Sequence, residues 1–346
     1  MLEPGRPRLS LCIATVERAA LLAEMLSTLE AQWGPGLELV IVDGGSRDET
    51  PEVVARFRDR LAPLTYIKLA ERGGFDQDYH RAVAAAHGDY AWLLSDDDSL
   101  EPDAIAVVLA TLASDPSLVV VNSTLYDATL THPLGPGQLR LSADALYPAT
   151  DYTRLFVDTA NQLSFVGAVV IDRALWLRRT PERYFGSLFG HVGVIFQSPL
   201  PAHAVALARP LIRVRAANAS WSQRYFEVWM FLWPQLIWSF EGLPDTAKQA
   251  VFAREPWRRP GALAICRAKA SYDQATYARW IAPRLPSGPN RWVAAFIARL
   301  PGPLVNALAV SYFRLFRPNA RADLLDFTLS PYHWSRLGAG RAKRDR

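Results

Sequence analysis

The sequence predicts an α/β domain with a mostly parallel sheet flanked by helices, followed by a helical, aromatic-rich C-terminal region. Apolar runs of strand length alternate with segments of helical spacing through the first 125 residues, which is typical of a parallel sheet. Polar clusters follow four of these runs. Past Trp221 the chain becomes aromatic and helical, with Trp229, Trp233 and Trp238 inside 226–240.

The strands are expected over residues 9–14, 37–42, 65–69, 90–94 and 118–121. Residues 37–42 are apolar except for Glu38, as in a strand covered on both faces. A helix over 19–32 has Leu22, Leu26 and Leu29 on one side. Thr50 and Pro51 begin a second helix, and residues 78–86 form a third that Gly88 ends.

Later elements are less regular. The pattern weakens over 127–151, and residues 163–171 read as another strand, with Gly167 allowing close approach. Residues 292–316 look amphipathic and are broken into two helices by Pro301 and Pro303. We expect a catalytic domain over 1–215, with halves 8–125 and 126–215, and a helical region over 216–346.

Composition narrows the function classes. The chain has 346 residues, of which 50% are hydrophobic and 21% charged, so it can bury a large core. Cys12 and Cys266 form no disulfide framework, which fits a reducing compartment. Residues 1–8 lack the apolar stretch of a secretory signal, and no apolar run of about 18 residues exists. We therefore expect a cytoplasmic protein.

The C-terminus is basic in a chain of net charge +4. A basic tail can bind nucleic acid or an anionic membrane, and the 11 Trp residues favour a membrane or carbohydrate surface. We therefore expect a peripheral location on the inner face of the cytoplasmic membrane and no nucleic-acid partner. An amphipathic helix that packs on the core is the alternative for 292–316. The basic residues are Arg314, Arg317, Arg321, Arg336, Arg341, Lys343, Arg344 and Arg346.

Four polar loops are expected at one edge of the sheet, because ligands of such sheets bind outside the carboxyl ends of the strands. They are 15–18, 43–48, 72–76 and 96–98. Asp96, Asp97 and Asp98 repel each other unless a cation neutralises them, and oxygen ligands suit Mg²⁺ or Mn²⁺ holding a diphosphate. The alternative is a solvated acidic turn before a helix.

The other loops carry weaker signals. Asp43 could accept hydrogen bonds from a nucleobase, with Gly44 and Gly45 permitting a sharp turn; the alternative is an ordinary strand-to-helix turn with an Asx cap. Gly73 and Gly74 could let the backbone approach a diphosphate, or could form an ordinary turn.

Three segments together resemble family 2 glycosyltransferases of the GT-A fold. They are Leu-Ser-Leu-Cys-Ile-Ala-Thr-Val-Glu-Arg (9–18), Val-Ile-Val-Asp-Gly-Gly-Ser-Arg-Asp-Glu-Thr (40–50) and Trp-Leu-Leu-Ser-Asp-Asp-Asp-Ser-Leu (92–100). The likeness covers about residues 8–125. Gly-Gly-Phe-Asp-Gln-Asp-Tyr (73–79) and Asn-Ala-Ser-Trp (218–221) are similar to abequosyltransferase-like members that build bacterial O-antigen.

The resemblance implies an inverting, metal-dependent transfer from a nucleotide-sugar donor to a glycan acceptor, which we expect to be lipid-linked. It places Thr15 and Glu17 in the nucleoside pocket, Asp43 at the base, Asp96 and Asp97 at the ribose and metal, and Asp98 as the main metal ligand. Gly73, Gly74 and Asp76 belong to the donor side. The chain departs from the family at Val16-Glu17, where Tyr-Asn is frequent, and at His80, where Asn is frequent.

An inverting transfer needs a general base, which in the family is usually an acidic residue within a Glu-Asp pair. Residues 184–193 contain no such pair. His191 is the first candidate, because its ordinary pKa lies near neutrality; a structural or metal-side histidine is the alternative. Asp172, which also fits a strand-end turn, is the second, and Glu182 is the third.

Arginines near 218–221 are further candidates for binding. Arg213, Arg215 and Arg224 could hold a diphosphate or an acceptor phosphate, or could be surface arginines. Trp221 could stack on a sugar or lie in the core.

Two other functions are alternatives. A nucleotidyltransferase would need a Gly-rich, Lys-containing loop after the first strand, and 15–18 has none. A non-catalytic nucleotide-sugar-binding protein fits the missing Glu-Asp pair.

Overall fold

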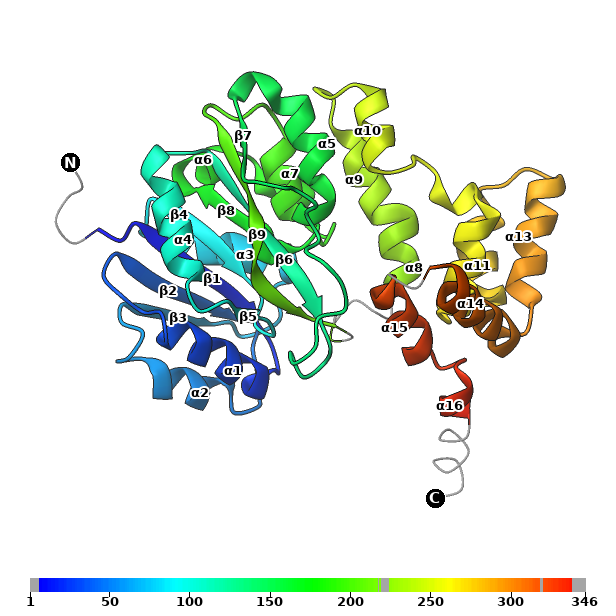
Figure 1. Cartoon of the computed structure of the whole chain (residues 1–346), viewed down its shortest axis with the longest axis horizontal. Helices are drawn as coiled ribbons and strands as arrows, with labels where there is room; N and C mark the ends of the chain where they lie inside the picture. The colour runs from blue at the N-terminus through cyan, green and yellow to red at the C-terminus, as the bar shows by residue number, and fades with distance from the viewer. Residues whose placement is uncertain (1–5, 217, 219–223, 318–319, 338–346) are drawn as a thin grey trace. The chain divides into compact units, whose positions relative to one another are not determined.

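The computed structural model describes residues 6–216, 218, 224–317 and 320–337, and Figure 1 shows the course of the chain. The chain divides into two compact units. The first comprises Met1–Arg215 with Leu236–Val251, and the second comprises Ala216–Gln235 with Phe252–Arg346.

The first unit is built on one mixed sheet (Figure 1). Its strands lie in the order β3 (Leu64–Lys68), β2 (Leu37–Asp43), β1 (Leu9–Thr15), β4 (Tyr90–Leu94), β8 (Val169–Asp172), β6 (Leu118–Tyr126), β9 (Ala204–Arg215) and β5 (Ser99–Leu100). The first four are mutually parallel. β8 runs antiparallel to both β4 and β6, and β7 (Ala145–Tyr147) pairs with β9.

Helices cover both faces of the parallel half. Leu9, Leu11 and Ile13 of β1 pack in one cluster with apolar residues of α1 (Ala19–Glu30), α2 (Thr50–Phe57) and α4 (Ala104–Thr111). α3 (Phe75–Ala85) contacts β1 and β2 but contributes nothing to that cluster, so it lies on the other face. Every residue of β2 is buried, as predicted for a strand covered on both faces.

Residues 126–215 contain α5 (Tyr152–Leu163), α6 (Arg173–Arg178) and α7 (Gly190–Phe196), and the first unit also includes α10 (Asp245–Val251). The strand predicted over 163–171 is wrong in its first part. α5 continues to Leu163, a 3₁₀ turn covers Val166–Ala168, and β8 begins only at Val169. A short apolar run does not distinguish a helix end from a strand by periodicity.

The second unit is helical. It begins with α8 (Tyr225–Glu227) and a π-helical segment (Val228–Leu232), and α9 (Trp233–Ser239) follows, with its residues from Leu236 onward belonging to the first unit. α11 (Pro260–Ala268), α12 (Gln274–Thr276) and a second π-helical segment (Tyr277–Ile281) follow. Its core includes Phe226 stacked on Tyr272, with ring centroids 5.2 Å apart.

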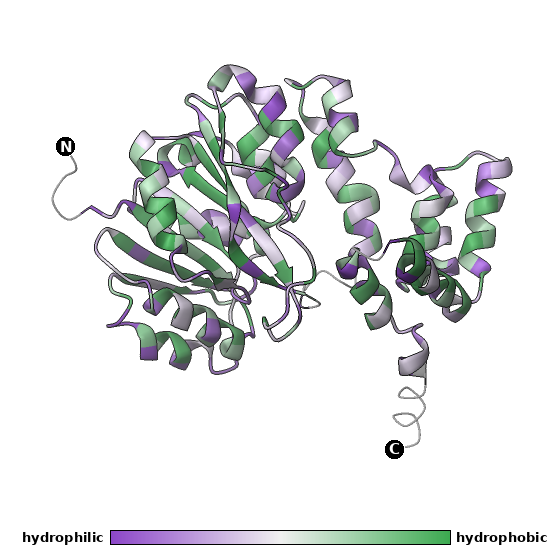
Figure 2. Cartoon of the chain, in the orientation of Figure 1, coloured by the Kyte–Doolittle hydropathy of each residue, from purple (hydrophilic) through white to green (hydrophobic). Residues whose placement is uncertain are grey.

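The predicted break at Pro301 is confirmed. α13 (Pro289–Arg299) and α14 (Gly302–Phe316) meet at a bend of 97°, and α15 (Arg321–Leu329) and α16 (Trp334–Leu337) complete the unit. Figure 2 shows how strongly apolar α14 is. Among the residues described, no single helix is long and apolar enough to cross a membrane, whereas α13 and α14 together meet the limits of length and composition.

Candidate active site

The carboxyl ends of β1, β2 and β4 are level with one another. Thr15 is paired with Asp43 across β1 and β2, and Ile13 is paired with Leu94 across β1 and β4. Because these strands are parallel, the loops that follow them meet at one edge of the sheet. The expected convergence of these polar loops is therefore present.

The acidic run Asp96–Asp98 is buried rather than solvated. The three residues are 5%, 8% and 3% exposed, so the alternative of a solvated acidic turn is wrong. Thr15 Oγ1 donates to Asp96 Oδ2 at 2.7 Å. The Arg18 guanidinium bridges Asp96 Oδ1 at 3.0 Å and Asp97 Oδ2 at 2.8 Å. The backbone N–H of Arg215 donates to Asp98 Oδ1 at 2.9 Å.

Burial makes the negative charge of this run costly. It raises the pKa of Asp96 to about 6, with a further contribution from Asp97, while Arg18 and Thr15 act in the opposite direction. Burial also raises the pKa of Asp98 well above its ordinary value, again reinforced by Asp97. The carboxylates therefore attract more positive charge than Arg18 supplies.

Oxygen donors of this kind fit the chemistry of a hard divalent cation such as Mg²⁺ or Mn²⁺. The described side chains do not already converge as a three-ligand metal site. Arg18 instead joins Asp96 and Asp97, and a cation bound to Asp96 would share or displace that guanidinium. The carboxylate oxygens therefore fit Mg²⁺ or Mn²⁺, and in the described conformation the Arg18 guanidinium lies beside them.

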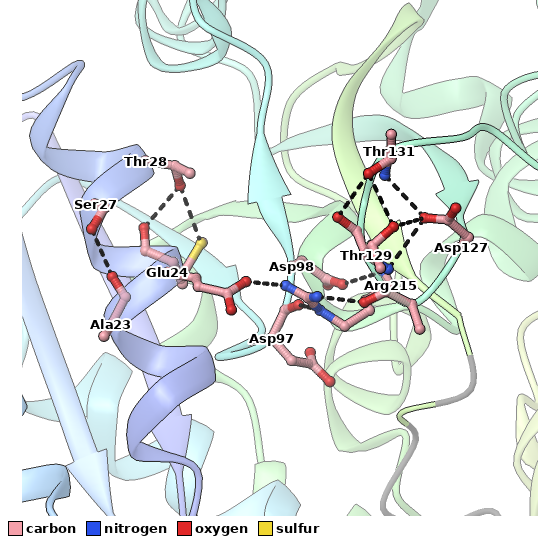
Figure 3. Close-up of polar contacts among 12 residues, drawn as sticks. Ala23, Glu24, Ser27, Thr28, Asp97, Asp98, Asp127, Thr129, Thr131 and Arg215 are labelled. Carbon is pink, nitrogen blue, oxygen red and sulfur yellow. Dashed lines mark hydrogen bonds and ion pairs between the residues drawn. The ribbon is translucent and has the colours of Figure 1, made fainter.

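Arg215 was predicted as a possible contact to a phosphate. In the structure it bonds instead to the backbone and carboxylates of the acidic run and its neighbours. Its side chain is 8% exposed. Nε donates to the Asp97 carbonyl at 2.9 Å, Nη1 donates to the Ala128 carbonyl at 2.6 Å, and Nη2 pairs with Glu24 of α1. Figure 3 shows the guanidinium between Glu24 and Asp97. With these contacts in place, the arginine fixes the backbone of the acidic run.

The other predicted anion-binding residues also have protein partners. Arg213 forms a two-bond pair with Glu101, at 2.8 and 2.7 Å. Arg224, in the second unit, pairs with Glu227 at 2.8 and 3.0 Å. These contacts favour the alternative that Arg213 and Arg224 are surface arginines. Trp221 lies outside the described residues.

Asp43 and Glu17 connect the loops that follow β1 and β2. Asp43 is fully buried; its Oδ1 accepts from the Ser46 N–H at 2.7 Å and its Oδ2 accepts from the Tyr66 hydroxyl. Glu17 Oε1 accepts from the Arg47 N–H at 2.8 Å. The Asp43 carboxylate therefore already holds the turn after β2, and a nucleobase would have to share it.

Two predicted donor-side glycines and Asp76 surround the start of α3. Gly74 has a φ of +111°, a conformation that favours glycine. Asp76 is buried, and it accepts from the N–H groups of Gly190 at 2.8 Å and Leu188 at 3.0 Å. Burial raises its pKa although these bonds oppose the shift. In this conformation Asp76 holds the start of α7. Gly73 packs tightly, because a Cβ there would lie 2.4 Å from Asp78 Oδ1.

Of the two first candidates for the general base, Asp172 lies away from the acidic run and His191 is buried. Asp172 is paired with Tyr90, the first residue of β4, so it lies at the other end of the strand from Asp96. There it accepts from the Leu175 N–H at 2.8 Å and caps α6. His191 is 3% exposed, and its Nε2 lies 2.8 Å from the Leu163 carbonyl. Burial lowers its pKa to about 4. Glu182, by contrast, is exposed and lies 3.8 Å from His80 Nε2.

We expect His191→Gln to retain most of the sugar-transfer activity, because the glutamine amide can still donate to the Leu163 carbonyl. Glutamine cannot act as a general base, so the variant separates a structural role of His191 from a catalytic one. His191→Phe should instead lower stability by about 1–3 kcal/mol, since the Leu163 carbonyl loses its partner. Urea unfolding and sugar-transfer rates of both variants check this. A loss of about 100-fold in transfer for a folded His191→Gln variant would restore His191 as the base.

Sequence reasoning gave no role to Arg18, although it included this residue in the polar loop after β1. The available signal was that Arg18 follows the end of β1 while Asp96–Asp98 follow the end of β4. Ends of parallel strands meet at one edge of the sheet, so an ion pair between them could have been expected. Glu24 carried none, because its pairing with Arg215 joins residues 191 positions apart.

Residues 10–179 match the family described as Glycosyl transferase family 2. The chain is 24% identical over 231 residues to the abequosyltransferase RfbV of Salmonella typhimurium, covering 62% of this chain and 69% of that protein. It is 34% identical over 125 residues to a PGL/p-HBAD biosynthesis glycosyltransferase of Mycobacterium bovis, covering 36% of this chain and 49%, about half, of that relative.

Solved structures share the fold. Staphylococcus aureus TarS 1–349 in complex with UDP-GlcNAc superposes with a TM-score of 0.55 at 16% identity, covering 97% of this chain and 92% of that one. The mannosyltransferase PcManGT of Pyrobaculum calidifontis, in complex with GDP-Man and Mn²⁺, gives 0.52 at 18% identity, covering 96% and 88%. The predicted α/β class and GT-A architecture are confirmed.

Proposed function

We propose that the chain transfers a sugar from a nucleotide-sugar donor to a glycan acceptor, as a glycosyl transferase of family 2, whose model residues 10–179 match. The observation that carries the proposal is the buried run Asp96–Asp98 at the carboxyl edge of the parallel strands. A buried run of carboxylates suits a divalent cation and, through it, a diphosphate.

The proposed roles are those that the family resemblance implies, and the positions of the residues support them. Thr15 and Asp96 lie together and would bind the ribose side of the nucleoside, while Glu17 and Asp43 border the base. Asp98 and Asp96 would hold Mn²⁺ or Mg²⁺, which when bound neutralises the departing diphosphate. Arg18 can turn from the carboxylates to the donor phosphates, because a guanidinium binds both groups in the same two-bond geometry.

In more detail, we propose an inverting transfer to a lipid-linked acceptor. The reaction would serve the synthesis of a bacterial O-antigen-like polysaccharide on the inner face of the cytoplasmic membrane. The likeness to an abequosyltransferase and to a PGL/p-HBAD biosynthesis glycosyltransferase supports a cell-surface glycan or glycolipid as the product. Nothing in the described site selects the sugar.

A second candidate function is a non-catalytic nucleotide-sugar-binding protein. The burial of His191 and the distant position of Asp172 favour it, because Asp172 lies at the other end of β4 and the His191 ring is covered by protein. Such a protein would keep the donor site and lack turnover.

Sugar transfer separates the two candidates. The full chain is incubated with UDP-, GDP-, CDP- and dTDP-sugars, Mn²⁺ and a bacterial lipid-linked glycan fraction, and transfer of labelled sugar to lipid is measured. We expect transfer from one nucleotide class only. Tight donor binding without transfer would replace the enzyme by the binding protein, and neither binding nor transfer would contradict both.

A further inference from the structure

The second unit presents an apolar stripe along α14. Leu304, Leu308 and Leu315 are 54%, 63% and 74% exposed, and Tyr312 is also exposed. The spacing of four, four and three residues places them on one side of the helix. An exposed stripe of this size on a helix calls for a partner.

The opposite side of α14 is anchored in the protein. Asn306 is fully buried, and its Nδ2 donates to the carbonyls of Ala268 at 3.0 Å and Phe327 at 2.9 Å. Val310 is buried in the same cluster with Phe327. The stripe is therefore a fixed outer face of the second unit, and Figure 2 shows the apolar character of the helix.

Basic and aromatic side chains border the stripe. Arg314 lies 5.5 Å from the ring centroid of Trp334, which is half exposed, and Phe316 and Arg317 are exposed at the end of the helix. Residues 289–317 contain four arginines and no Asp or Glu. Aromatic and basic residues beside an apolar face are the composition of a helix that lies in a membrane interface.

Charge distinguishes between two possible partners of the α14 stripe, a second copy of the chain and an anionic lipid surface. A two-fold contact with a second copy would bring this arginine-rich face against itself, with no carboxylate in 289–317 to pair with it. The nearest downstream carboxylates, Asp323 and Asp326, face Lys269 at 3.9 and 2.7 Å. An anionic lipid surface supplies both the apolar layer and the opposite charge.

We propose that the outer face of α14, with Arg314, Arg317 and Trp334, docks in the plane of an anionic lipid bilayer. The helix has 15 residues, about 22 Å, which is shorter than the roughly 30 Å hydrocarbon core. Its inner face is occupied by protein, so the helix lies on the bilayer and does not cross it. This inference stands independently of the donor chemistry in the first unit.

The test is co-sedimentation of the full chain with vesicles of phosphatidylglycerol and phosphatidylethanolamine, compared with phosphatidylcholine alone. We expect binding to the anionic vesicles and at least a tenfold loss in the double variant Leu308→Gln, Leu315→Gln. The matched control is Leu146→Gln, Leu177→Gln, which changes two exposed leucines of the first unit and should bind normally. Circular dichroism verifies that both variants are folded.

A charge variant gives a second, independent measurement. Arg314→Gln with Arg317→Gln should weaken binding to anionic vesicles by about fivefold for each arginine and leave any binding to phosphatidylcholine unchanged. Equal sedimentation of the leucine variant and the wild type would overturn the proposal. So would a solution dimer that the leucine variant dissociates while neither protein binds vesicles.

Discussion

Asp98→Asn is expected to abolish cation-dependent donor binding and to lower sugar transfer by about a thousandfold. The amide oxygen can still accept from the Arg215 N–H, so the backbone of the acidic run should keep its course. What is lost is the negative charge that attracts the cation, and neutralising a leaving diphosphate lowers the barrier to transfer by several kcal/mol. Donor titrations with and without Mn²⁺ and transfer rates measure the effect.

Asp103→Asn is the matched control. This carboxylate follows the acidic run by five residues, is exposed and pairs with Arg209 at 2.7 Å. The Asp103→Asn variant should retain both Mn²⁺-dependent donor binding and sugar transfer. Unchanged Mn²⁺-dependent binding in a folded Asp98→Asn variant would contradict the metal assignment.

Asp96→Asn is expected to raise the free energy of unfolding at pH 7.5 by about 1–3 kcal/mol while removing donor binding. Burial raises the pKa of Asp96 to about 6 in the folded state, above its ordinary value of 3.8. Between these two pH values the folded chain binds more protons than the unfolded chain. Stability therefore falls as the pH rises through this window, at about 1.4 kcal/mol for each unit of pKa shift.

Urea unfolding at pH 7.5 and pH 4.5 tests the sign. The stabilisation by Asp96→Asn should be present at pH 7.5 and should shrink at pH 4.5, where Asp96 of the folded wild type is largely protonated. A variant that is less stable at pH 7.5 would mean that the Arg18 ion pair outweighs the desolvation of Asp96.

The parallel half of the fold could be predicted because its signals are local. Residues 37–42 are predicted as a strand because they are apolar except for Glu38, and the observed strand, Leu37–Asp43, is buried throughout. Residues 163–171 could not be assigned in the same way, because Leu163 ends an amphipathic helix whose inner face continues the apolar run. The direction of β8 was also unpredictable, since it depends on pairing with both β4 and β6.

The candidate site shows the same division. The position of Asp96–Asp98 follows from the end of β4, so the sequence predicts it. The partners of these carboxylates do not follow, because Arg18 and Arg215 reach them across 78 and 117 residues of chain. The burial of His191 is likewise set by the Leu163 carbonyl of a different helix.

The most direct test of the central claim is a calorimetric titration of the full chain with UDP, GDP, CDP and dTDP, each with and without Mn²⁺. The account predicts that one nucleotide binds, that its binding requires Mn²⁺, and that Asp98→Asn removes it while Asp103→Asn does not. Binding that is equally strong without a divalent cation, or that survives in Asp98→Asn, would contradict a cation-dependent diphosphate site at Asp96–Asp98.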